Sequence, residues 1–94
     1  MILFEDRESA TKIFIELRQN PDGGLTLSGQ DIGEAPKTCF GKSDYEYAVT
    51  VPESAVPLLA MHLLAEKYRN DAEAVSGLRE FCERHLVPCS FWSH

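Results

Sequence analysis

An alternating run of residues, followed at once by a turn, constrains the fold of this chain more than any other feature. In residues 11–18, β-branched or aliphatic side chains occupy every second position, and charged side chains fill most of the positions between them. A period of two with β-branched residues predicts a half-buried strand. The segment Asn20-Pro21-Asp22-Gly23-Gly24 comes next, and its proline and glycines suit a tight turn. The pattern therefore predicts a hairpin, with residues 25–28 as the returning strand.

A third strand is predicted over residues 45–51. The alternation there places Tyr45, Tyr47 and the two valines that follow them on one face. Pro52 ends the strand because proline has no N–H to donate to a sheet. Residues 29–43 show no periodicity and contain three glycines and one proline, so we expect a loop.

The second half of the chain predicts two helices. Apolar residues recur at helical spacing up to Tyr68, and the first helix is expected to begin near residue 53 or 54 with Ser54 as its N-cap. The second helix is expected to start at Asn70 or Asp71 and to end near residue 85 or 86, because Pro88 cannot continue it. The aromatic segment 89–94 is expected to be a short extended or β tail.

Strands grouped before helices indicate the α+β class. We therefore predict one domain over residues 1–94, in which a three-stranded antiparallel sheet is followed by two helices packed on one face. The content of hydrophobic residues, 44%, argues against disorder.

The charge balance narrows the classes of partner. Fifteen Asp and Glu residues against nine Lys and Arg residues give a formal net charge of −6. This sign disfavours nucleic acid and anionic membrane surfaces as partners. It is compatible with a basic protein partner or a cation, and a charge of this size is also ordinary for a protein that has to stay in solution. Three cysteines, an odd number, and an N-terminus without the pattern of a secretory signal indicate a reducing cytoplasm.

The spacing Cys82-x-x-His85-x-x-x-Cys89, with Cys39 as a fourth ligand, is within the range of zinc sites. The paired Cys-x-x-Cys or His-x-x-x-His knuckles of common zinc sites are absent, however. Cys82 also belongs to the apolar stripe of its helix, where cysteine acts as a small hydrophobic residue. We favour a structural role and expect no metal and no cofactor. A metal- or small-ligand-binding domain that uses Cys82, His85 and Cys89 remains the alternative.

No motif in the sequence points to catalysis. Cys39 has no histidine near it in the sequence, and a cysteine nucleophile needs a neighbouring base. Two pairs of carboxylates stand out, Asp31 with Glu34 and Asp44 with Glu46. They do not follow the spacing of a calcium-binding loop and are better explained as a solvated face. Gly41-Lys42-Ser43 imitates the end of a phosphate-binding loop, but a predicted strand follows it where that loop needs a helix. We therefore expect a protein that is not an enzyme.

Three short motifs carry a resemblance. They are Gly29-Gln30-Asp31-Ile32-Gly33, then Asp44-Tyr45-Glu46-Tyr47, and Phe91-Trp92-Ser93 near the C-terminus. Together they resemble a group of small bacterial proteins of uncharacterised activity, which have leucine in place of Ile32. The resemblance runs from about residue 25 to the end of the chain. It implies a bacterial origin and residence in the cytoplasm, and it transfers no catalytic residue.

These observations favour a small acidic protein-binding module with an immunity-like or regulatory role. Its surface would combine carboxylates, which attract a basic partner, with an aromatic anchor. The predicted binding residues are Asp31, Glu34, Phe40, Asp44, Tyr45 and Glu46.

Overall fold

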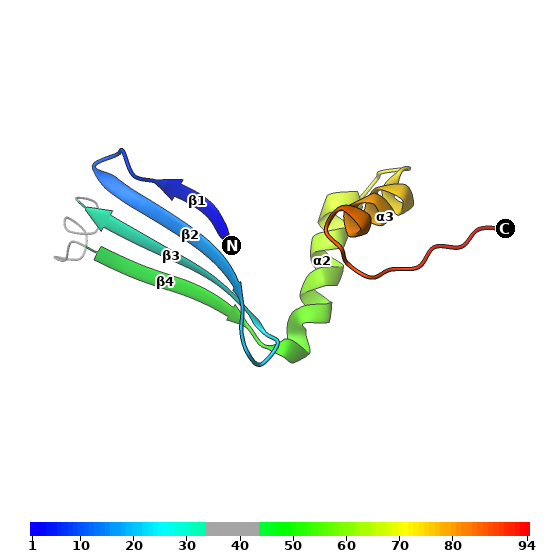
Figure 1. The fold of residues 1–94 in the computed structure, drawn as a ribbon, viewed down its shortest axis with the longest axis horizontal. Helices are drawn as coiled ribbons and strands as arrows, with labels where there is room; N and C mark the ends of the chain where they lie inside the picture. The colour runs from blue at the N-terminus through cyan, green and yellow to red at the C-terminus, as the bar shows by residue number, and fades with distance from the viewer. Residues whose placement is uncertain (34–43) are drawn as a thin grey trace. The chain divides into compact units, whose positions relative to one another are not determined.

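The computed structural model describes residues 1–33 and 44–94 and belongs to the α+β class (Figure 1). The chain divides into two compact units, residues 1–59 and 60–94. The first unit contains an antiparallel sheet in which each strand pairs with the next one along the chain. Among the described residues, no helix is both long and apolar enough to cross a membrane.

The sheet has four strands, not the predicted three. Its strands are β1 (Ile2–Asp6), β2 (Thr11–Gln19), β3 (Leu25–Gly33) and β4 (Asp44–Val51). The prediction missed β1 because three apolar residues stand in a row at its start, without alternation. The pairing of β1 with β2 shifts register between Ile2 and Phe4, and this irregularity hides the period of two.

The turn between β2 and β3 forms as predicted. The amide of Gly23 donates to the carbonyl of Asn20 at 3.0 Å, and the amide of Asn20 donates to the carbonyl of Gly24 at 2.8 Å. Gly23 has a φ of 93°, which glycine adopts without the steric cost that other residues meet. The side chain of Asp22 accepts a hydrogen bond from the amide of Gly24 at 2.9 Å and holds the turn closed.

Strand β3 is longer than predicted and runs to Gly33. Residues 29–33 were expected to be in a loop. Residues 29–32 instead pair with both β2 and β4, and Gly33 pairs with Thr11 of β2. These residues lack the alternation of apolar side chains that is typical of a strand. The reason is that the ring of Tyr47 lies where a side chain at Gly29 would stand. An aromatic side chain from the neighbouring strand thus replaces the apolar residue that β3 lacks.

The sheet has one apolar face and one polar face. Residues directly opposite each other in paired strands lie on the same face, so the register defines both sets. The apolar face carries aliphatic and tyrosine side chains, including Ile13, Ile15, Leu17, Leu25, Leu27, Tyr45, Tyr47, Val49 and Val51. The polar face carries mainly charged, amide and hydroxyl side chains, including Lys12, Glu16, Arg18, Thr26, Ser28, Gln30, Asp44, Glu46 and Thr50.

A short 3-10 helix, η1 (Glu53–Ala55), leads directly into α2 (Val56–Tyr68). The helical segment begins at Glu53, as predicted, but the prediction of Ser54 as its N-cap was wrong. Ser54 lies within η1, whose first residue follows Pro52 without a capping side chain. The amide of Ala55 instead donates to the carbonyl of Pro52 at 2.9 Å.

The second unit contains α3 (Ala74–Arg84), which begins a few residues later than predicted. Asp71 does not cap α3. Its carboxylate accepts a hydrogen bond from the amide of Glu73 at 2.8 Å and orders the turn before the helix. A Cβ at Gly77 would lie 3.0 Å from the ring of Tyr68, so glycine allows α3 to pass close to the end of α2.

The chain leaves α3 at the predicted place, with His85 as the C-cap. Residues 87–94 contain neither helix nor strand, so of the two predicted forms of the tail the strand does not occur. The ring of Phe91 lies against the guanidinium group of Arg79. The guanidinium carbon is 4.4 Å from the centre of the ring.

Candidate functional site

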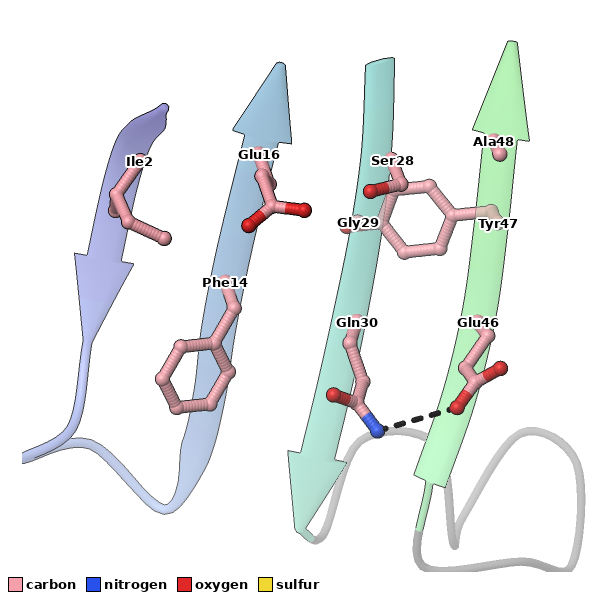
Figure 2. Close-up of a pocket in the computed structure, with 9 residues that line it drawn as sticks. All are labelled: Ile2, Phe14, Glu16, Ser28, Gly29, Gln30, Glu46, Tyr47 and Ala48. Atoms are coloured by element: carbon pink, nitrogen blue, oxygen red, sulfur yellow. Dashed lines mark hydrogen bonds between the residues drawn. The ribbon is translucent and has the colours of Figure 1, made fainter. Parts of the chain in front are cut away.

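A hollow on the polar face of the sheet is the candidate site. Its volume is about 550 Å³, and we call it the polar-face hollow. Side chains from three neighbouring strands surround it, and β1 contributes one more, as Figure 2 shows. The residues of the polar face that line it are Ile2, Phe14, Glu16, Ser28, Gln30, Glu46 and Ala48. Gly29 and Tyr47, which belong to the apolar face, also border it.

The register of the sheet explains how these side chains meet. Glu16 pairs with Ser28, which in turn pairs with Ala48, so these three residues form one row across the polar face. Phe14, Gln30 and Glu46 form the next row in the same way. Each row contributes one carboxylate, and the two carboxylates stand on strands that flank β3 (Figure 2).

Polar contacts hold one of these carboxylates in place. The side-chain amide of Gln30 donates a hydrogen bond to Oε1 of Glu46 at 3.3 Å. The guanidinium carbon of Arg7 lies 5.6 Å from the centre of the Phe14 ring, within the range of a cation–π contact. Arg7 also pairs with Glu5, next to the hollow. The hollow thus combines two carboxylates with an aromatic ring that already lies beside a guanidinium group.

A second polar arrangement lies on the apolar face. The hydroxyl of Tyr47 donates a hydrogen bond to Oδ1 of Asp31 at 2.8 Å. The rings of Tyr45 and Tyr47 are tilted, with centres 5.4 Å apart. The hydrogen bond to Asp31, followed by burial and by the charges of Asp31 and Tyr45, raises the pKa of the Tyr47 phenol above its ordinary value of 10.0.

The predicted binding residues lie on both faces of the sheet. Asp31 and Tyr45 are directly opposite each other on the apolar face. Asp44 and Glu46 are on the polar face, and of these only Glu46 lines the polar-face hollow. Glu34 and Phe40 are outside the described residues, as is Cys39. The role of the six residues in binding stays a prediction.

Sequence reasoning missed most of the polar-face hollow. Glu16, Ser28 and Gln30 are ordinary polar residues until the register brings them together. One signal was present, because Phe14 is the single apolar residue on the polar side of its strand. A lone aromatic side chain on a polar face indicates a place where something apolar or cationic can lie.

The cysteine and histidine residues of the proposed zinc spacing lie at the end of α3. Cys82 and Cys89 line one hollow together. The ring of His85 instead lies against the ring of Phe81, with centres 4.4 Å apart. Within residues 1–33 and 44–94, no group of three or more His, Cys, Asp or Glu side chains is arranged to hold a metal ion.

Comparison of the chain with protein-family models, with curated proteins and with solved structures finds no match. The resemblance to a group of small bacterial proteins therefore stays a prediction.

Proposed function

We propose that this protein is a non-enzymatic binding module that recognises a basic protein partner and takes one of its cationic side chains into the polar-face hollow. The observation that supports this most is the placement of Glu16 and Glu46 in one hollow, on either side of β3. A lysine or arginine side chain between two carboxylates gains charge-assisted hydrogen bonds from both.

The surroundings of the two carboxylates also suit a guanidinium group. The Phe14 ring can bind a cation through its face, and Arg7 already lies in such a position. The net charge of −6 would attract a basic partner over longer distances and speed its association. Both effects weaken with salt, because exposed charges are screened.

Two of the predicted binding residues, Asp44 and Glu46, lie on the polar face. Glu46 has a direct role, and Asp44 adds charge on the same face. Asp31 and Tyr45 would take part only if the partner also reached around the outer edge of β4. The packing of both helices on one face of the sheet remains part of this proposal. The apolar face is the one that needs a cover, which would leave the polar face to a partner.

A titration with a short arginine peptide, capped at both ends, tests the hollow directly. Two-dimensional NMR spectra of the labelled protein should show shift changes that concentrate on the residues of the polar-face hollow. Glu16→Gln and Glu46→Gln should each weaken the binding by roughly two- to fivefold, which is typical of one exposed charge pair. Added salt should weaken it further.

Asp44→Asn is the matched control. It removes the same charge from the same strand and the same face, two residues away from Glu46, but outside the polar-face hollow. If Asp44→Asn weakens the peptide as much as Glu46→Gln does, net charge alone attracts the peptide and the hollow is not a site. Shift changes spread evenly over the acidic surface would lead to the same conclusion.

The cellular partner can be sought from the same position. A photo-crosslinking amino acid in place of Ser28 lies between the two carboxylate-bearing strands. The captured protein, once purified, should bind the wild-type chain in a salt-dependent way and should lose affinity with Glu46→Gln but not with Asp44→Asn. If neither substitution changes the affinity of the captured protein, the proposed surface is contradicted.

A further inference from the structure

The C-terminal end of α3 folds back on itself. The amide of Val87 donates to the carbonyl of Cys82 at 2.9 Å, and the amide of Leu86 donates to the carbonyl of Glu83 at 3.4 Å. Leu86 has a φ of 58°, so it adopts the left-handed conformation that reverses the chain. These two bonds form a Schellman motif, which caps the helix with the segment that follows it. The motif holds the residues after Val87 near the last turn of α3.

Cys89 comes two residues after Val87, on the side of the hollow that Cys82 also lines. The two cysteines line the same hollow, of about 540 Å³, together with Arg79, Pro88 and Phe91. Cys82 is buried, with 7% of its surface exposed, whereas Cys89 is exposed. Burial raises the pKa of the Cys82 thiol, and the charge and hydrogen bond of Cys89 raise it further. The two thiols therefore lie close to each other at this hollow.

We propose that Cys82 and Cys89 form a reversible disulfide within one chain, and that Cys89 is the sulfur that reacts first. The exposed thiol is the one that an oxidant can reach. The buried thiol is held beside it by the Schellman motif and is placed to attack it in turn. This pairing is independent of the polar-face hollow, which lies in the other unit.

The reaction balances with hydrogen peroxide as the oxidant. The thiolate of Cys89 attacks one peroxide oxygen, the O–O bond breaks, and hydroxide leaves and takes up a proton to become water. Cys89 is then a sulfenic acid. The Cys82 sulfur, after giving up its proton, attacks the Cys89 sulfur, and the S–O bond breaks as water leaves. In total, the two thiols lose two electrons and two protons, and one peroxide becomes two waters. A dithiol reductant restores both thiols by exchange.

Peptide mapping of the wild-type protein before and after treatment with peroxide tests the proposal. The expected product is a peptide pair that joins Cys82 to Cys89 and has lost two hydrogens. Dithiothreitol should restore both thiols to alkylation. A disulfide that joins Cys39 to Cys82 or to Cys89, or a disulfide of Cys39 between two chains, would overturn the proposal.

Single substitutions separate the roles of the two cysteines. The Cys39→Ser background removes competing bridges. In that background, Cys82→Ser should halt the reaction at the sulfenic acid of Cys89, which dimedone traps. Cys89→Ser should leave Cys82 slow to alkylate and slow to oxidise. The Cys39→Ser protein that retains Cys82 should give less trapped sulfenic acid than the one with Cys82→Ser. Equal trapping in the two proteins would show that Cys82 does not attack Cys89. Circular dichroism of each variant checks that α3 is retained.

Discussion

The hydrogen bond between Tyr47 and Asp31 ties together two strands that sequence patterns describe separately. Its acceptor is a carboxylate, so ionisation of the Tyr47 phenol would place two negative charges side by side and lose the donated proton. This explains why the pKa of Tyr47 is raised. The folded state therefore favours the neutral phenol more than the unfolded state does. The resulting stabilisation is present below pH 10.0, the ordinary pKa of tyrosine, and is lost as the pH rises through the higher folded pKa.

In the ultraviolet absorbance of the phenolate, we expect the Tyr47 phenol to ionise above pH 10.0. Asp31→Asn removes the negative charge, so the titration of Tyr47 should move towards lower pH. Glu46→Gln removes the same charge on the opposite face of the sheet and should leave the titration unchanged. An unchanged titration in Asp31→Asn would contradict the assignment of the raised pKa to this hydrogen bond.

Leu86 has a backbone conformation that costs most side chains energy. Its φ of 58° lies in the left-handed region, which costs an L-residue roughly 1–2 kcal/mol. Its side chain is 90% exposed, so little hydrophobic burial offsets this cost. Leu86→Gly should stabilise the protein by about 0.5–1 kcal/mol, because the greater freedom of glycine in the unfolded chain cancels part of the gain. Thermal or urea unfolding measures the change.

Val87→Gly is the control for that substitution. Val87 donates to Cys82 through its backbone, and it is not among the residues with positive φ. Glycine there brings the same freedom to the unfolded chain without relieving strain, so the variant should be less stable than the wild type. A stabilising effect of both substitutions would mean that the strain at Leu86 is not the cause.

At the level of elements, two glycines of β3 have different reasons to be glycine. At Gly29 a Cβ would overlap the ring of Tyr47, a side chain that is 39% exposed and can move. At Gly33 the φ is 131° and a Cβ would overlap the backbone carbonyl of Ala10, which cannot move without distorting the strand pairing. The first glycine makes room for a neighbouring side chain, and the second allows a backbone conformation.

Alanine at either position should destabilise the protein by about 1–3 kcal/mol, but only one of the two costs can be rescued. In a Tyr47→Ala background the cost of Gly29→Ala should largely disappear, because the overlapping ring is gone. The cost of Gly33→Ala should persist in the same background. A double-mutant cycle on unfolding free energies measures both values. Additivity at Gly29 would show that the Tyr47 ring does not occupy that space.

The fold could be predicted from the sequence wherever one strand or helix carries its own pattern. Strands β2 and β4, the turn at Gly23 and the place where α3 ends follow from alternation, glycine and proline. Strand β1 could not be found because its irregular pairing removes the alternation. The second half of β3 was assigned to a loop because Tyr47, a residue of another strand, supplies the apolar group there.

The candidate site was harder to predict than the fold, for a related reason. Glu46 was recognised as a binding candidate, but its companion Glu16 is thirty positions earlier in the sequence. The two meet only through the register of three strands, and register depends on every pair in the sheet. Short sequence patterns record which face a residue occupies, but not which residues on that face become neighbours.

For the whole molecule, the balance of charge should dominate the response to salt. The two ion pairs among the described residues, Arg7 with Glu5 and Arg79 with Glu83, are both exposed. Each contributes roughly 0–1 kcal/mol, and screening removes little from such pairs. The net charge of −6, by contrast, means that the excess acidic side chains repel one another in the folded state.

Moderate salt should therefore raise the melting temperature at neutral pH. The same salt series near pH 4.9, the isoelectric point from the sequence, is the control. With the net charge near zero, the rise should shrink or vanish. A melting temperature that falls with salt at neutral pH would mean that attractive ion pairs outweigh the repulsion.

The sequential order of the strands also has a kinetic consequence. Because each strand pairs with the one before it in the chain, the sheet can grow by adding neighbours to a first hairpin, with little loss of chain entropy at each step. The turn between β2 and β3 is only five residues long and is held closed by Asp22, so this hairpin should form early. Asp22→Ala, which removes the acceptor for the Gly24 amide, should then slow folding. Val49→Ala, in the last strand to be added, should chiefly speed unfolding. The two arms of a chevron plot would thus record the order in which the strands assemble.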